Sequence, residues 1–106
     1  MPVTIKRKND YIYAFLKGEI DHHTAPEIRE TIDDALSTSE TAKILVLDFG
    51  EVSFMDSSGV GLVMGRYRYA TRLGKKICVD NLDNRNYKIM QMSGIEKIAE
   101  INKKEM

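Results

Sequence analysis

The sequence contains almost no cysteine and none of the common nucleotide-binding motifs. Cys78 is the single cysteine, so no disulfide can form within the chain, and no zinc-type spacing of cysteine and histidine occurs. Neither Gly-x-Gly-x-x-Gly nor Gly-x-x-x-x-Gly-Lys-Ser/Thr is found, so no motif supports nucleotide binding. We therefore expect no cofactor and no metal, and we interpret Cys78 as a small core side chain.

The chain also lacks a surplus of charge and lacks long apolar runs. Its 16 Lys and Arg residues balance its 16 Asp and Glu residues. A neutral chain is a poor match for nucleic acid or an anionic membrane, because both favour a basic excess. No apolar run reaches the roughly 18 residues of a membrane span, and the N-terminus lacks the apolar core of a signal peptide. We expect a cytoplasmic protein that binds neither nucleic acid nor membrane.

What the sequence does contain is an alternation of strand and helix patterns over 106 residues, the length of one domain. Val3 and Ile5 alternate with polar residues, and a turn at 8–10 leads to a second predicted strand at 11–16. Further strands are predicted at 43–49 and 77–79, and helices from 24, at about 60–73, and from 83 or 84 to 93. Residues 95–101 fit either a short strand or a helical turn, and 102–106 a frayed tail. We predict a single α/β domain, residues 1–106, with a mixed sheet, an N-terminal antiparallel hairpin and helical crossovers.

Local signals predict which side chains are buried. Thr24 and Glu27 have the spacing of a capping box. The first helix is expected to bury one face, made of Ile28, Ile32, Ala35 and Leu36. The second is expected to repeat Val60, Val63, Met64, Tyr67 and Ala70, with Arg66 on another face. Residues 43–49 are apolar without alternation, which predicts a strand covered on both faces of the sheet.

A serine turn, residues 54–61, joins the predicted strand at 43–49 to the helix after it. Ser57 and Ser58 therefore lie where the carboxyl end of a strand meets the N-terminus of a helix, a position that suits anions and partners. Gly59 and Gly61 carry no side chains that would keep another surface away. The two hydroxyls fit phosphorylation, phosphate binding or nucleophilic catalysis.

Simpler and rival interpretations apply to the same residues. Asp56 and the serines are ordinary helix-capping residues. A nucleophilic Ser57 needs a base, for which only His22 and His23 are available, and Gly-x-Ser-x-Gly is absent. A further alternative is a cation site at the sheet edge, formed by Asp21, Asp48 and Asp56. Met55, beside the serine, is interpreted as an exposed contact residue.

Four segments, at 18–24, 53–61, 65–67 and 92–95, carry a resemblance to a known family. In this order they resemble the anti-sigma factor antagonists, which are STAS-domain proteins. The combination of Asp-His-His-Thr with Phe-Met-Asp-Ser-Ser-Gly is most similar to the members that act in sporulation. The resemblance covers nearly the whole chain and implies a STAS-like fold.

The resemblance also implies a partner-switching role without enzymatic activity. In that family the unphosphorylated protein binds an anti-sigma factor that is also an ATP-dependent serine kinase, and the sigma factor is released. The kinase phosphorylates the serine after the motif aspartate, here Ser57, and a serine phosphatase reverses the reaction. The residues expected to contact the partner are Asp21, His23, Met55, Asp56, Ser58, Gly59 and Gly61.

Two features at the C-terminal end depart from the family pattern. The tail after Ile101 is short where such domains often end in a further helix, and residues 80–86 lack the proline common before the third helix. The alternatives are a STAS binding module of a stress or sensory assembly and a serine-nucleophile enzyme. The serine segment itself matches the family pattern.

Overall fold

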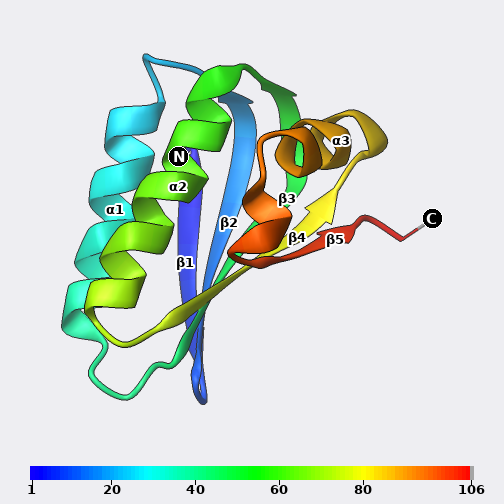
Figure 1. Ribbon diagram of the computed structural model, residues 1–106. Coiled ribbons are helices and arrows are strands. Elements are labelled where there is room, and N and C mark those ends of the chain that lie inside the picture. The colour runs from blue at the N-terminus through cyan, green and yellow to red at the C-terminus, as the bar shows by residue number, and fades with distance from the viewer. Residues whose placement is uncertain (106) are drawn as a thin grey trace.

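The fold is a five-stranded sheet with helices packed against it (Figure 1), and the computed structural model describes residues 1–105. The strands are β1 (Val3–Lys8), β2 (Tyr11–Ile20), β3 (Ile44–Met55), β4 (Lys76–Leu82) and β5 (Glu100–Lys103). The helices are α1 (Ala25–Thr38), α2 (Ser57–Arg72), α3 (Asn84–Met92) and the short 3₁₀-helix η1 (Ile95–Lys97). The sheet order is β1-β2-β3-β4-β5, and only β1 runs antiparallel to its neighbour. The predicted α/β class, mixed sheet and N-terminal hairpin are confirmed.

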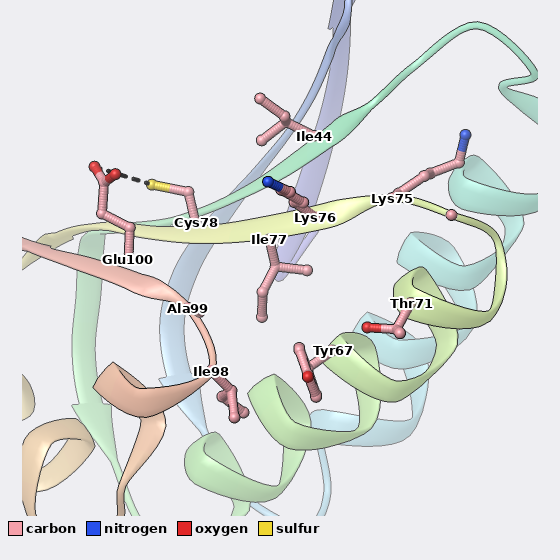
Figure 2. A pocket seen from close by; sticks show the side chains of 11 residues that line it. Ile44, Tyr67, Thr71, Lys75, Lys76, Ile77, Cys78, Ile98, Ala99 and Glu100 are labelled. Atoms are coloured by element: carbon pink, nitrogen blue, oxygen red, sulfur yellow. Dashed lines mark hydrogen bonds between the residues drawn. The ribbon is translucent and has the colours of Figure 1, made fainter.

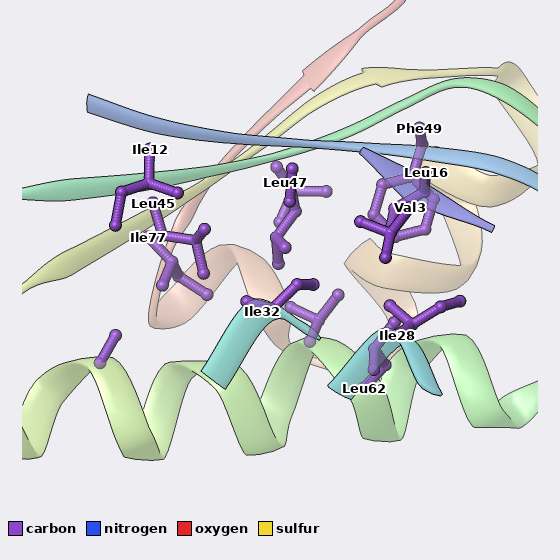
Figure 3. Close-up of a cluster of buried hydrophobic side chains, with 14 of the residues drawn as sticks. Val3, Ile12, Leu16, Ile28, Ile32, Leu45, Leu47, Phe49, Leu62 and Ile77 are labelled. Atoms are coloured by element: carbon purple, nitrogen blue, oxygen red, sulfur yellow. The ribbon is translucent and has the colours of Figure 1, made fainter. Parts of the chain in front are cut away.

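One face of the sheet carries the helices, whereas β3 was predicted to be covered on both faces. From β2 onward each crossover moves one strand in the same direction, and right-handed crossovers then place every helix on the same side. The core forms in this layer (Figure 3), with Ile12, Leu45 and Leu47 of the sheet facing Ile32 of α1. Val46 points the other way and lies outside this core, although it is only 4% exposed.

Strands β2 and β3 are longer than predicted. The expected loop from Gly18 instead continues β2 as far as Ile20, and β3 extends past Phe49 to Met55. The two strands stay paired through two register shifts to Ile20↔Met55, and Gly18 lies in one shifted stretch with φ 82°. Such irregularities bend a ladder without ending it, so apolar alternation alone underestimates its length. The serine turn therefore begins directly at the end of β3, where β3 is still paired with β2.

The two long helices meet through an ion pair that the sequence pattern had not predicted. Arg66 was assigned to an outer face of the second helix, but its side chain is buried and its Nε lies 2.8 Å from Asp33 Oδ1 of α1. Burial lowers the pKa of Arg66, and Asp33 opposes this change by favouring the charged guanidinium. Of the predicted apolar repeat, Val63 and Ala70 are fully buried while Val60, Met64 and Tyr67 are half-buried. The buried face of α1 is as predicted.

The C-terminal part contains an edge strand where residues 102 and 103 were predicted to fray, and Met106 of the predicted tail lies outside the described residues. Residues 95–97 form η1, and Asn102 and Lys103 belong to β5, with the Lys104 amide donating to the carbonyl of Leu82. Asp83 caps α3 as predicted, accepting from the Asn86 amide at 2.7 Å. Among residues 1–105, no helix combines the length and the apolar character needed to traverse a lipid bilayer.

Candidate functional site

Asp56 and the two serines form a capped helix start at the carboxyl end of β3. The Asp56 amide donates to Ile20 of β2, and its Oδ1 accepts from the Ser58 amide at 2.7 Å. The Gly59 amide donates to the Asp56 carbonyl at 3.0 Å, which closes the first turn. Asp56 is therefore the N-cap of α2, and Ser57 is the first helical residue, with an exposed side chain.

A second polar turn, residues 21–24, follows β2. Asp21 Oδ1 accepts from the amides of His23 at 2.9 Å and Thr24 at 3.0 Å. These bonds, that from Thr24 first, lower the pKa of the Asp21 carboxyl, which is therefore ionised at neutral pH. The Thr24 hydroxyl accepts from the Asp21 amide and donates to the Glu19 carbonyl, both at 3.0 Å. The predicted capping box is wrong, because Thr24 makes no side-chain cap to the helix and instead binds the strand end behind it.

The parallel pairing of β2 and β3 brings these two turns to one edge of the sheet. Ile20 and Met55 are partners in the register, so the segments after them start side by side. A groove of about 410 Å³ lies between the starts of α1 and α2, and its lining includes His22, Ser58, Gly61 and Gly65. A Cβ placed on Gly61 or Gly65 would meet no atom, so the floor of the groove is open. The structure thus gathers Asp21, His23, Asp56, Ser57, Ser58 and Gly61 at this edge.

Met55 is not an exposed contact residue, which corrects the sequence-based interpretation. Its side chain is 0% exposed because it is the last residue of β3 and points into the core. Gly59 lies directly against it: a Cβ at Gly59 would overlap Cγ and Sδ of Met55. Gly59 is itself buried. Both residues support the serine turn from beneath, whereas Gly61 lies on the open surface.

Phe54, the first residue of the serine turn, and Arg85 of α3 were not predicted as site residues. Phe54 is 45% exposed, and the Arg85 guanidinium lies over its ring, 5.8 Å from the centroid. Arg85 Nη1 also donates to the Met55 carbonyl at 3.3 Å. Arg85 lies 30 residues away in the chain and arrives with α3, so only the resemblance of the segment around Phe54 pointed to this corner. The edge therefore presents an aromatic ring and a cation beside the serine.

The arrangement is an exposed surface rather than an enclosed active site. The His22 and His23 rings lie 4.0 Å from each other, and within residues 1–105 neither imidazole is hydrogen-bonded to Ser57. A pocket of about 600 Å³ opens elsewhere, between the start of β4, the second half of α2 and η1 (Figure 2). None of the predicted site residues lines it. In the described part of the chain, no group of three or more metal-binding side chains occurs.

Comparison with known proteins identifies the fold family. A family model described as STAS domain matches residues 2–105. The chain belongs to the STAS domain family. As a STAS domain it carries the serine turn, the Asp21 turn and the groove on one edge of the family's sheet.

Relatives of this STAS domain include anti-sigma factor antagonists of two kinds. It is 36% identical over 86 residues to an anti-sigma F factor antagonist of Paenibacillus polymyxa, covering 81% of this chain and 73% of the relative. It is 30% identical over 96 residues to an anti-sigma-B factor antagonist of Listeria monocytogenes, covering 91% and 82%.

The solved structures similar to this STAS domain include both forms of one regulator. The anti-sigma factor antagonist SpoIIAA in its unphosphorylated form matches with a TM-score of 0.79 and 30% identity, over 93% of this chain and 86% of that one. The Bacillus cell fate determinant SpoIIAA in its phosphorylated form matches with a TM-score of 0.73 and 30% identity, over 93% and 89%. SpoIIAA therefore keeps this fold in both forms.

Proposed function

We propose that this STAS domain is an anti-sigma factor antagonist that is switched by phosphorylation of Ser57. Its unphosphorylated form binds an anti-sigma factor with ATP-dependent serine kinase activity, so that the sigma factor is released. A serine phosphatase restores the unphosphorylated form, which binds the anti-sigma factor. The cycle takes place in the cytoplasm, where it regulates transcription. The observation that carries the proposal is the exposed Ser57 on the capped first turn of α2, in a chain similar to SpoIIAA.

The local electrostatics favour a switch in the interface over a switch in the fold. A phosphate adds about −1.5 to −2 charges and three acceptor oxygens. The N-terminus of α2 tolerates this charge, because its first amides and helix dipole favour an anion. A partner packed on the same turn meets added bulk, charge and desolvation. A loss of about 2.8 kcal/mol in binding free energy weakens affinity a hundredfold.

The proposed partner surface consists of the two turns and the groove between them. Asp21 supplies an ionised carboxylate, His23 an exposed ring and Gly61 an open floor onto which a partner backbone can pack. Asp56 and Ser58 hold the turn in position through the 2.7 Å cap. Phe54, with Arg85 over its ring, adds an apolar contact at the rim.

The test is a phosphorylation and binding assay with candidate anti-sigma kinases of the sigma-F and sigma-B types. The protein is incubated with each kinase and ATP, phosphate is located by mass spectrometry, and the complex is measured as phosphate accumulates. We expect phosphate on Ser57 alone, none in Ser57→Ala, normal modification in Ser58→Ala, and weaker binding after modification. Phosphate on Ser58 in the unchanged protein, or binding that is indifferent to phosphate, would overturn the proposal.

The same proteins separate this function from an enzymatic one. A nucleophilic Ser57 would react with a fluorophosphonate probe and would lose that reaction in His22→Ala or His23→Ala. We expect no labelling in any of these variants, because the serine turn offers capping hydrogen bonds and no hydrogen-bonded base. Labelling that depends on a histidine would assign the turn to catalysis.

A further inference from the structure

Within residues 1–105, no helix or strand covers the face of the sheet opposite the helices, and this face carries an ordered pattern of side chains. We call it the open face and define it by two rows of residues that the strand register aligns. The first row is Lys8, Tyr11, Ile44 and Lys76, and the second is Lys6, Tyr13, Val46, Cys78 and Glu100. Figure 2 shows Cys78 and Glu100 on the side of β4 away from α2, while Ile77 points toward Tyr67.

The middle of the open face is apolar and rigid. The rings of Tyr11 and Tyr13 stack with centroids 5.7 Å apart, and the ladder continues to Phe15 at 6.0 Å. Ile44 and Val46 lie beside them on β3. Stacked rings keep few side-chain conformations free, so contact with a second surface costs little further entropy.

The two edges of the open face have opposite charge. Lys6 and Lys8 are exposed on β1, whereas Glu100 is exposed on β5. The row beyond contains Phe15 and two carboxylates that already have partners within the chain. Asp48 accepts from Asn81 Nδ2, and Asp80 accepts from Asn102 Nδ2, both at 2.8 Å. Glu100 also accepts from Asn102 Nδ2 at 2.9 Å but stays exposed, so attraction to another surface is expected from the two defined rows.

We propose that the open face binds a second copy of this chain in a symmetric, face-to-face dimer. A two-fold axis along β3 puts the β1 edge of one copy over the β5 edge of the other. Lys6 then faces Glu100 of the second copy, Tyr11 faces Lys76 of the second copy, and the half-buried Tyr13 faces the half-buried Cys78 of the second copy. The single two-fold rotation therefore pairs opposite charges, places a cation over an aromatic ring and brings the apolar centres of the two copies together.

The dimer is weak and leaves the serine turn free. With strands about 4.8 Å apart and rows about 6.7 Å apart, the open face buries roughly 300 Å² per copy, below the roughly 800 Å² of a standard interface. The open face lies opposite the helix layer, so the helix start at Ser57 is not covered. Self-association and partner binding are therefore independent.

Charge reversal at the two edges tests the proposal. Sedimentation of the full chain from about 10 μM to about 1 mM is expected to show a mass that rises with concentration and falls back at high salt. We expect Lys6→Glu and Glu100→Lys each to weaken the dimer at least tenfold, and an equimolar mixture of the two variants to recover it. The control is Lys88→Glu, an exposed charge on α3, which is expected to have no effect.

Two results would overturn the dimer. One is a monomer throughout the concentration range at low salt. The other is a dimer that both edge variants leave unchanged, or that their mixture fails to restore. Circular dichroism of each variant checks folding. Phosphorylation of Ser57 in the edge variants keeps this test separate from the proposed switch.

Discussion

Gly59 shows how a single methyl group can disturb the serine turn from beneath. We expect Gly59→Ala to destabilise the protein by about 1–3 kcal/mol, because its Cβ would overlap the buried Met55 side chain. The matched control is Gly61→Ala, two residues along the same helix, where a Cβ meets no atom. That variant should gain about 0.5–1 kcal/mol from better helix propensity.

Urea unfolding of the two variants measures this difference directly. A second change, Met55→Ala, opens space beneath Gly59 and is expected to make the alanine at 59 less costly than in the unchanged background. Equal stabilities of Gly59→Ala and Gly61→Ala would contradict the close packing of Met55 on α2.

Cys78 is a second residue whose environment makes a measurable prediction. Burial raises the pKa of its thiol to about 12, and the Asp80 carboxylate, which accepts from the thiol at 3.3 Å, acts in the same direction. The thiol is half-buried on the open face rather than in the core, but it is still expected to be unreactive. A thiol with a pKa of about 12 contains about a thousandfold less thiolate below pH 9 than a thiol with the ordinary pKa of 9.0.

Alkylation by iodoacetamide near pH 8 is therefore expected to be much slower in the folded protein than in urea. Asp80→Asn should speed the folded reaction by removing a nearby negative charge. The sign for stability follows from the same shift. Ionisation of the thiol is easier in the unfolded chain, so the folded state should lose stability as the pH rises above about 9. Equal alkylation rates in the two states would refute this account.

At the scale of elements, the contact between α1 and α2 includes one partly buried ion pair, Arg66 with Asp33. Arg66→Met leaves the Asp33 carboxylate without its guanidinium partner and is expected to cost about 2–3 kcal/mol. This loss of folding stability is at or below the lower end of the range for breaking a buried ion pair, because the Asp33 side chain is 31% exposed.

The double variant Arg66→Met with Asp33→Leu tests the cause. With both charges replaced by apolar groups, the loss should shrink to less than about 1 kcal/mol. Denaturant unfolding of the two single variants and the double variant gives the coupling energy. Simple addition of the two single losses would show that packing, and not the ion pair, holds the helices together.

At the scale of the whole molecule, phosphorylation of Ser57 is expected to leave the fold intact. Ser57 is exposed at the N-terminus of a 16-residue helix, so a phosphate meets solvent and free helix amides. The melting temperature should move by less than about 4 °C, which corresponds to under about 1 kcal/mol for a domain of this size.

Backbone amide NMR spectra of the two forms locate the change. Shifts are expected in residues 21–24, 54–61 and 85, which meet at the serine edge, and not in β1 or β5. Loss of dispersed signals throughout the spectrum would mean that phosphorylation acts on the fold and not on the interface.

Much of the fold could be predicted from the sequence because short-range physics determines it. The buried face of α1 follows from 3.6-residue periodicity, and Asp83 caps α3 through bonds within one turn. Ser57 stands at a helix start because Asp56 beside it is a strong N-cap. The order of strands and helices, and hence the sheet, follows from signals of the same range.

Only the tertiary structure decided the features that join distant parts of the chain. The burial of Met55 and of Arg66, and the position of Arg85 over Phe54, depend on neighbours 30 or more residues away or on which face a strand presents. The length of β2 and β3 depends on pairing through register shifts, and the open face on crossovers that all turn the same way. Periodicity and capping depend on residues within the same turn or strand, so they can be recognised in the sequence. The contacts named here form only when distant elements pack against one another.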